Sequence, residues 1–157
     1  MFGFFKSFFG NSVNDSLIAE DAAQAMDALD IQMAKAAHEN WKLRLQAYLD
    51  GASTEDLSAE TICFDDRCDL GQWIHGPGQQ RLGRFPGFTA LKGHHKMFHY
   101  AASNVVALAK AGREDEARRM LATQFAGFSK QVVDELDRLE AVATEVKKVR
   151  STRRRAA

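Results

Sequence analysis

The stretch GHHKMFH at residues 93–99 places His95 and His99 four positions apart. On an α-helix, residues i and i+4 lie one turn apart on the same face, so the two imidazoles can bind one metal ion from one side. Four-coordinate zinc requires two further ligands, usually cysteine thiolate or imidazole. His38 and Cys68 are candidates for these positions. The rest of the chain is interpreted as the scaffold that brings the four side chains together.

Each candidate ligand has a simpler explanation when it is taken alone. A single histidine on a half-apolar helix face, such as His38, is more often a core residue with a satisfied hydrogen bond. A single cysteine such as Cys68 is usually a small buried apolar residue. The pair formed by His95 and His99 could arise by chance. The metal site is therefore predicted from the combination of the four residues with the pattern around them.

Composition indicates a single helical domain. The chain has 157 residues, of which 45% are hydrophobic and 27% are charged, with only two prolines. This length is sufficient for one domain with its own core. Two cysteines do not suggest a fold built on disulfides. The chain has no apolar stretch of about 18 residues, and its first ten residues lack the charged leader of a signal peptide. We therefore expect a cytoplasmic protein.

Apolar residues that recur every three or four positions predict an all-α fold, a four-helix bundle in which a short extra helix carries Cys68. Gly51 and Gly112 are expected to end two of the long helices, because glycine is favoured just after a helix C-terminus. The stretch between residues 52 and 67 has no clear period, and Asp65 or Asp66 could cap the short helix. The expected helices are one from residue 14 or 15 to about 50, a short one through residues 68–74, one from about 88 to 111, and one from about 114 to 149.

The two ends of the chain differ from this bundle, which is assigned to residues 14–149. The segment at residues 1–13 is rich in phenylalanine, and it could pack on the bundle, on a second subunit or at a membrane surface, with packing on protein favoured. Six basic groups lie in the last eleven positions, and residues 150–157 form a basic tail. The tail suits a solubilising helix end, or binding to an acidic partner or membrane, whereas nucleic acid is an unlikely ligand. The phenylalanines are Phe2, Phe4, Phe5, Phe8 and Phe9, of which Phe2, Phe5 and Phe9 are the candidates for docking.

Three motifs carry a resemblance to a known family. They are H-x-x-W at residues 38–41, C-x-L-G-x-W at residues 68–73 and H-x-x-F-H at residues 95–99. In their order and spacing they resemble the chemoreceptor zinc-binding domain, the CZB family, over about residues 30–111. The resemblance implies that zinc is the cofactor, with three histidines and one cysteine as its ligands, and that further motif positions support the site. The implied ligands are His38, Cys68, His95 and His99, and the implied supporting residues are Trp41, Gly71 and Trp73.

The resemblance also implies a regulatory function. Proteins with this domain regulate chemotaxis or cyclic-di-GMP synthesis in response to zinc or, in some cases, to hypochlorous acid, and the family suggests a homodimer. Cys68 would be the redox-sensitive residue, because a metal-bound thiolate is the form that oxidants attack. Cys63 could resolve an oxidised Cys68, although a buried structural role is favoured. The signalling protein that would receive the output is unidentified.

We do not expect an enzyme. Three imidazoles and one thiolate fill a tetrahedral zinc site, which leaves no position for an activated water. Lys96 lies where zinc peptidases of the H-E-x-x-H type have a catalytic glutamate. Two hypotheses remain: a stand-alone zinc-binding sensor, and a structural adaptor that zinc stabilises without a sensing role.

Overall fold

The computed structural model describes residues 15–155, and these residues form helices and connecting turns without a β-strand. The predicted all-α fold is therefore confirmed. The predictions for Phe2, Phe5 and Phe9 fall outside the described residues and stay predictions. The elements in chain order are α2 (Asp15–Met26), α3 (Ile31–Leu49), α4 (Ala59–Ile62), α5 (Asp69–Trp73), the π-helical turn η1 (Ile74–Gly78), α6 (Gln79–Leu82), α7 (Pro86–Lys110), α8 (Glu114–Met120), the π-helical turn η2 (Leu121–Phe125) and α9 (Ala126–Arg155).

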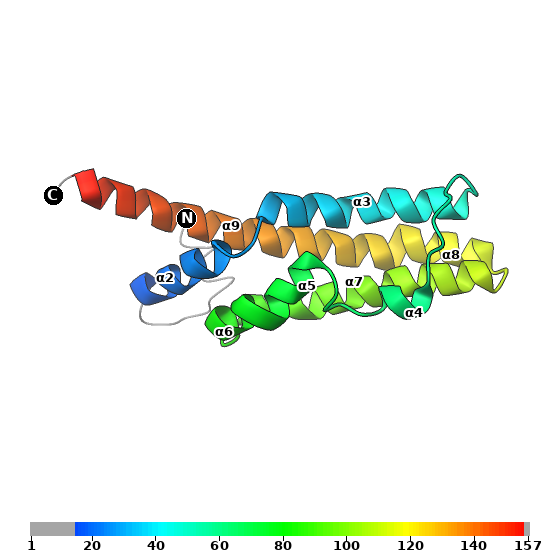
Figure 1. Cartoon of the computed structure of the whole chain (residues 1–157), viewed down its shortest axis with the longest axis horizontal. Coiled ribbons are helices and arrows are strands. Elements are labelled where there is room, and N and C mark those ends of the chain that lie inside the picture. The colour runs from blue at the N-terminus through cyan, green and yellow to red at the C-terminus, as the bar shows by residue number, and fades with distance from the viewer. Residues whose placement is uncertain (1–14, 156–157) are drawn as a thin grey trace.

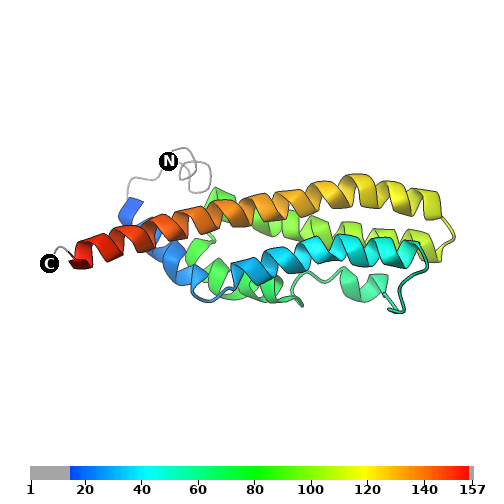
Figure 2. The same ribbon diagram turned by 90° about the horizontal axis from the view of Figure 1, so that it is seen from above.

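The helices form an elongated bundle with alternating chain direction (Figure 1). Helix α3 runs along the bundle, and the chain returns through the short elements α4, α5, η1 and α6. Helix α7 then runs parallel to α3, and the continuous rod of α8, η2 and α9 runs back antiparallel to both. The view in Figure 2 shows the same three long rods side by side, with the short elements on the remaining side. The short elements α4, α5, η1 and α6 thus stand where the described part of the bundle has no long helix, and Cys68 immediately precedes α5.

The single helix predicted from residue 14 to residue 50 is wrong in one place, because it is broken between α2 and α3. Asp30 ends the break, since its side chain accepts a hydrogen bond from the backbone N–H of Met33 at 3.0 Å and so caps the N-terminus of α3. On the other side of the break, the indole N–H of Trp73 donates to the carbonyl oxygen of Ala25 at 2.8 Å, near the C-terminus of α2. The first interaction satisfies a backbone N–H that the helix start leaves unpaired, and the second adds an indole donor to a carbonyl that also accepts the N–H of Ala28 at 3.3 Å.

The expected glycine stops are present. Gly51 and Gly112 have φ values of 66° and 74°, the left-handed conformation in which glycine closes a helix. The helix that follows Gly112 continues through the boundary expected near residue 149 and ends at Arg155. The hydroxyls of Ser151 and Thr152 donate to the carbonyl of Lys148, so these residues are accommodated inside the helix.

The irregular stretch before Cys68 contains a short helix, α4, that the sequence pattern did not predict. Its order comes from contacts with α7, since the hydroxyl of Ser103 donates to the carbonyl of Ala59 at 2.7 Å. Four residues are too few to form a stable helix alone. Among residues 15–155, the structure has no helix that is both long and apolar enough to cross a bilayer.

Candidate metal centre

Three elements bring four potential metal ligands together in the middle of the bundle. His38 lies on α3, Cys68 immediately precedes α5, and His95 and His99 lie one turn apart on α7. One ligand atom from each of the four residues can be chosen so that all four lie within 4.8 Å of one another. The three histidines are buried, with 3%, 0% and 5% of their surfaces exposed, and Cys68 is half-buried. The residues singled out from the sequence therefore converge from distant parts of the chain.

Backbone carbonyls fix the orientation of two of the imidazoles. Nδ1 of His38 lies 2.7 Å from the carbonyl oxygen of Ala34, and Nδ1 of His99 lies 2.7 Å from that of Ile62. A carbonyl oxygen can only accept, so Nδ1 carries the proton in both rings and Nε2 offers a lone pair. This arrangement is typical of metal-binding histidines, whose second nitrogen donates to a fixed acceptor.

The distances between donor atoms suit a tetrahedral zinc site. The sulfur of Cys68 lies 3.3 Å from Nε2 of His95 and 3.7 Å from Nε2 of His99. Zn–S and Zn–N bonds of usual length at a tetrahedral angle separate sulfur and nitrogen by about 3.6 Å. Three neutral imidazoles with one thiolate are also a donor set that zinc favours. The four residues therefore suit zinc, which at such a site would hold together the segments that carry the ligands.

Burial sets the protonation of the four side chains. Desolvation lowers the pKa of His38 to about 4, and desolvation also lowers the pKa values of His95 and His99. The imidazoles are consequently neutral at pH 7 and have free lone pairs. Desolvation raises the pKa of the Cys68 thiol, so the metal-free residue keeps its proton at neutral pH. A metal ion bound at the sulfur displaces that proton, which makes binding dependent on pH.

Cys68 itself caps α5, in place of the predicted Asp65 or Asp66. Its sulfur accepts the backbone N–H of Gly71 at 3.3 Å. Gly71 is required at this position because a Cβ there would lie 1.7 Å from the carbonyl oxygen of Asp65. The supporting role expected for Gly71 thus has a physical reason: the loop before Cys68 packs directly on the first turn of α5.

The two tryptophans of the motifs have different environments. Trp73 is 3% exposed, packs edge-on against Phe88 and connects α5 to α2 through its bond to Ala25. Trp41 is half-buried and packs against the core one turn after His38, with the guanidinium of Arg44 3.9 Å from its ring centroid. Trp73 therefore helps to fix the element that carries the cysteine, and Trp41 lies on the helix that carries the first histidine.

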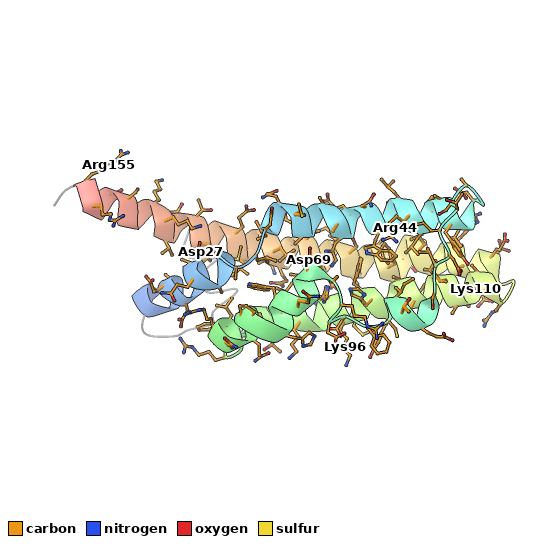
Figure 3. The ribbon with its side chains drawn as sticks, in the orientation of Figure 1. Asp27, Arg44, Asp69, Lys96, Lys110 and Arg155 are labelled. Atoms are coloured by element: carbon orange, nitrogen blue, oxygen red, sulfur yellow. The ribbon has the colours of Figure 1, made fainter. Side chains whose placement is uncertain are left out.

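A groove of about 650 Å³ leads to the cluster between α5 and the turn that joins α2 to α3. Both His38 and Cys68 line it, together with mainly apolar side chains, and Asp69 at the start of α5 lies on the side of that helix toward α3 (Figure 3). Met33, also on the wall, is 63% exposed, so the groove reaches the surface. On the other side of the site, Figure 3 shows Lys96 on the outer face of α7. Among the ligand candidates, Cys68 is thus partly accessible through the groove, whereas the three histidines are buried.

Two residues near the cluster, Asp65 and His75, make contacts that the sequence did not indicate. The Asp65 carboxylate accepts a hydrogen bond from Nε2 of His75 at 3.0 Å and lies 3.9 Å from Nδ1 of His95. No local pattern indicates this, because the contacts depend on how the loop before α5 folds. His94 does not belong to the cluster, and the Cys63 thiol donates to the carbonyl of Glu60.

Comparison with known proteins agrees with this geometry. Residues 38–106 match the family model of the chemoreceptor zinc-binding domain, CZB. The matched segment begins at His38 and includes Cys68, His95 and His99. No curated protein and no solved structure matched the chain. Residues 38–106 are therefore similar to the chemoreceptor zinc-binding domain, and the four-residue cluster lies within this matched segment as a candidate zinc site.

Proposed function

We propose that the protein is a zinc-binding sensory or regulatory module that binds one ion per chain through His38, Cys68, His95 and His99. The observation that supports this most directly is the position of His38 on α3. Among the described side chains of α3, His38 is the one that is fully buried between Ala34 and Leu45. The middle of α3 therefore contacts the bundle through a fully buried potential ligand, with the half-buried Trp41 packed beside it.

Other contacts of α3 in this region are weak. Lys35 pairs with Asp137 and Glu140 on α9 at 2.7 and 3.3 Å, and Gln32 donates to Glu140 at 2.7 Å. Ion pairs near the surface contribute about 0–1 kcal/mol each. A ligand that prefers the closed arrangement can shift such an equilibrium in proportion to that preference. We propose that the position of α3 reports whether the site is filled.

Oxidation of Cys68 is the second proposed input. The groove gives small oxidants a path to the sulfur, and a metal-bound thiolate is more reactive than the protonated thiol of the metal-free residue. With hypochlorous acid, the thiolate gives up two electrons and takes the oxygen, which forms sulfenic acid and releases chloride. The oxidised sulfur is a poor ligand, so the site would lose one of its four donors.

The output of the module would pass to another protein. We propose a cytoplasmic homodimer that acts on a signalling protein in trans, in chemotaxis or in cyclic-di-GMP signalling. Docking through Phe2, Phe5 and Phe9, on protein or at a membrane surface, is a further proposal. The filled donor set supports regulation over catalysis, because it has no vacant position for a substrate or an activated water.

The alternative is a structural zinc site in an adaptor without a sensing role. It is supported by the packing of the ligands into the core: the His38 ring lies 4.9 Å from that of Phe98, which lies 4.9 Å from that of Phe125. In this case, removal of the metal would destabilise the whole core, because the ligands pack directly against the core side chains.

A chelator titration followed by hydrogen exchange distinguishes the two functions. If the module is a sensor, amides of α3 lose protection when zinc is removed, while those of α7 and α9 keep theirs. If zinc is purely structural, all three helices lose protection together and circular dichroism reports unfolding. His95→Ala should reproduce the zinc-free pattern, and His94→Ala, the matched control, should behave as wild type. Identical exchange in α3 with and without zinc would contradict the sensor.

A further inference from the structure

Asp65 occupies a defined place behind the metal cluster. Its side chain is 17% exposed, and Oδ2 faces two histidines: Nε2 of His75 at 3.0 Å and Nδ1 of His95 at 3.9 Å. The other ring nitrogen of His95, Nε2, faces the sulfur of Cys68 at 3.3 Å. The carboxylate thus lies on the side of the His95 ring that is turned away from the ligand atoms.

The backbone around Asp65 is held by its neighbours in the fold. The carbonyl of Asp65 occupies the space where Gly71 has no side chain, at the first turn of α5. The same turn presents its N–H to the sulfur of Cys68. The position of the carboxylate is therefore tied to the position of the cysteine, through a close backbone contact rather than a flexible side chain.

His95 lacks the acceptor that the other two histidines have. Nδ1 of His38 and Nδ1 of His99 contact carbonyl oxygens at 2.7 Å, whereas Nδ1 of His95 is buried without a hydrogen-bond partner. When Nε2 of an imidazole binds a metal ion, Nδ1 carries a proton and requires an acceptor. A buried donor without an acceptor is unfavourable, because it has lost its hydrogen bonds to water.

We infer that Asp65 is a positioning residue of the zinc site, which accepts the Nδ1–H of His95 when that ring binds zinc. The separation of 3.9 Å exceeds a hydrogen bond by about 1 Å, so a small movement of either side chain suffices. The carboxylate fixes the tautomer and orientation of the one ligand ring that backbone carbonyls leave unfixed, and its charge makes that ring a better donor to the metal.

His75 has a subordinate part in this arrangement. It is 37% exposed, and its contact with Oδ2 of Asp65 at 3.0 Å limits where the carboxylate can turn. A partly exposed pair of this kind contributes little by itself. If Asp65 acted only by tying the loop to His75, removal of either residue would have the same effect on zinc binding. A direct action on His95 instead makes Asp65 the more important of the two.

The test measures zinc affinity by competition with a chromophoric chelator, in the full chain. Asp65→Ala should weaken binding by roughly 10- to 100-fold, the usual effect of removing such an acceptor. Asp65→Asn keeps an acceptor oxygen without the charge and should fall between wild type and Asp65→Ala. His75→Ala should stay within about threefold of wild type, since it leaves the carboxylate in place. Asp66→Ala, an equal change of charge in the same loop, should leave the affinity unchanged.

A second measurement follows the ring of His95 directly. In nitrogen-15 spectra of the zinc-loaded wild type, Nδ1–H of His95 should exchange slowly, and Asp65→Ala should accelerate that exchange while circular dichroism stays unchanged. Any of three results would overturn the inference. They are equal zinc affinities of wild type and Asp65→Ala, equal losses of affinity in Asp65→Ala and His75→Ala, and a proton exchange rate at His95 that does not change in Asp65→Ala. The inference rests on zinc binding at the four-residue cluster. A wild-type chain that binds no zinc would overturn that site as well. A wild type that binds zinc, with the same affinity as Asp65→Ala, would overturn the role of Asp65 and leave the site intact.

Discussion

Replacement of Gly71 by alanine tests how closely the metal site depends on the backbone around it. The added Cβ would lie 1.7 Å from the carbonyl oxygen of Asp65, 2.8 Å from its carbonyl carbon and 3.1 Å from Cα of Asp66. All three atoms belong to the backbone, so no rotation of a side chain can relieve the overlap. The loop and the first turn of α5 have to move apart.

The size of that movement sets the expected effect. The Cβ and the oxygen must separate by more than 1 Å to reach 3.0 Å, the closest distance that such atoms show. Zinc–ligand distances tolerate only about 0.2 Å, and the sulfur of Cys68 is attached to the turn that moves. We therefore expect Gly71→Ala to weaken zinc binding at least tenfold, or about 1.4 kcal/mol. Overpacking should also lower the free energy of unfolding of the metal-free protein by about 1–3 kcal/mol.

The assay compares this variant with Gly93→Ala. Gly93 lies inside α7, two residues before His95, and a Cβ there meets no atom within 4 Å. Gly93→Ala should leave zinc affinity unchanged and stabilise the helix by up to about 1 kcal/mol. Zinc affinity comes from chelator competition, and the free energy of unfolding from urea denaturation with chelator present. Equal zinc affinities for the two alanine variants would refute the geometric argument.

Three further outcomes are expected. Trp73→Phe removes the donor to the carbonyl of Ala25 and should lower the free energy of unfolding by about 1–3 kcal/mol in urea denaturation; an unchanged midpoint would show that this bond is not needed. Phe98→Ala should cost about 3–5 kcal/mol, measured by thermal unfolding, because the ring is fully buried against His38; a cost below about 1 kcal/mol would contradict its place in the core. The metal-free protein should lose stability as the pH falls from 6.5 toward 4, because burial holds the pKa of His38 at about 4 and the unfolded chain binds the proton first. His38 alone contributes about 1.4 kcal/mol per pH unit to the free energy of unfolding in this window. In urea denaturation, the free energy of unfolding should therefore differ less between pH 7 and pH 5 in His38→Gln than in the wild type. An equal difference in the two proteins would contradict this origin.

Much of the site follows from local spacing. The four-residue interval between His95 and His99 places both rings on one face of α7, and this required only that the segment be helical. Gly51 and Gly112 end their helices for a reason that is equally local, the left-handed backbone that glycine adopts without strain. Such features depend on neighbours in the sequence and could be predicted without the fold.

Other features depend on contacts between distant segments. The break between α2 and α3 has a local signal in Asp30, yet the apolar period continues across it, and Trp73 from α5 donates to the Ala25 carbonyl near the end of α2. Helix α4 is ordered by Ser103 on α7, and the place of Asp65 behind His95 results from the packing of a loop on α5. Periodicity carries no information about these contacts, which explains why the stretch before Cys68 was the least predictable part of the chain.

The most direct test of the account is the zinc content of the purified chain, measured by mass spectrometry of the metal-loaded protein after removal of free ions. We expect one zinc ion per chain in the wild type. Conversion of any of His38, Cys68, His95 or His99 to alanine should abolish tight binding, and His94→Ala should leave it in place. A wild type that holds no zinc, or a set of four alanine variants that still hold one ion each, would contradict the claim that these side chains form the metal centre.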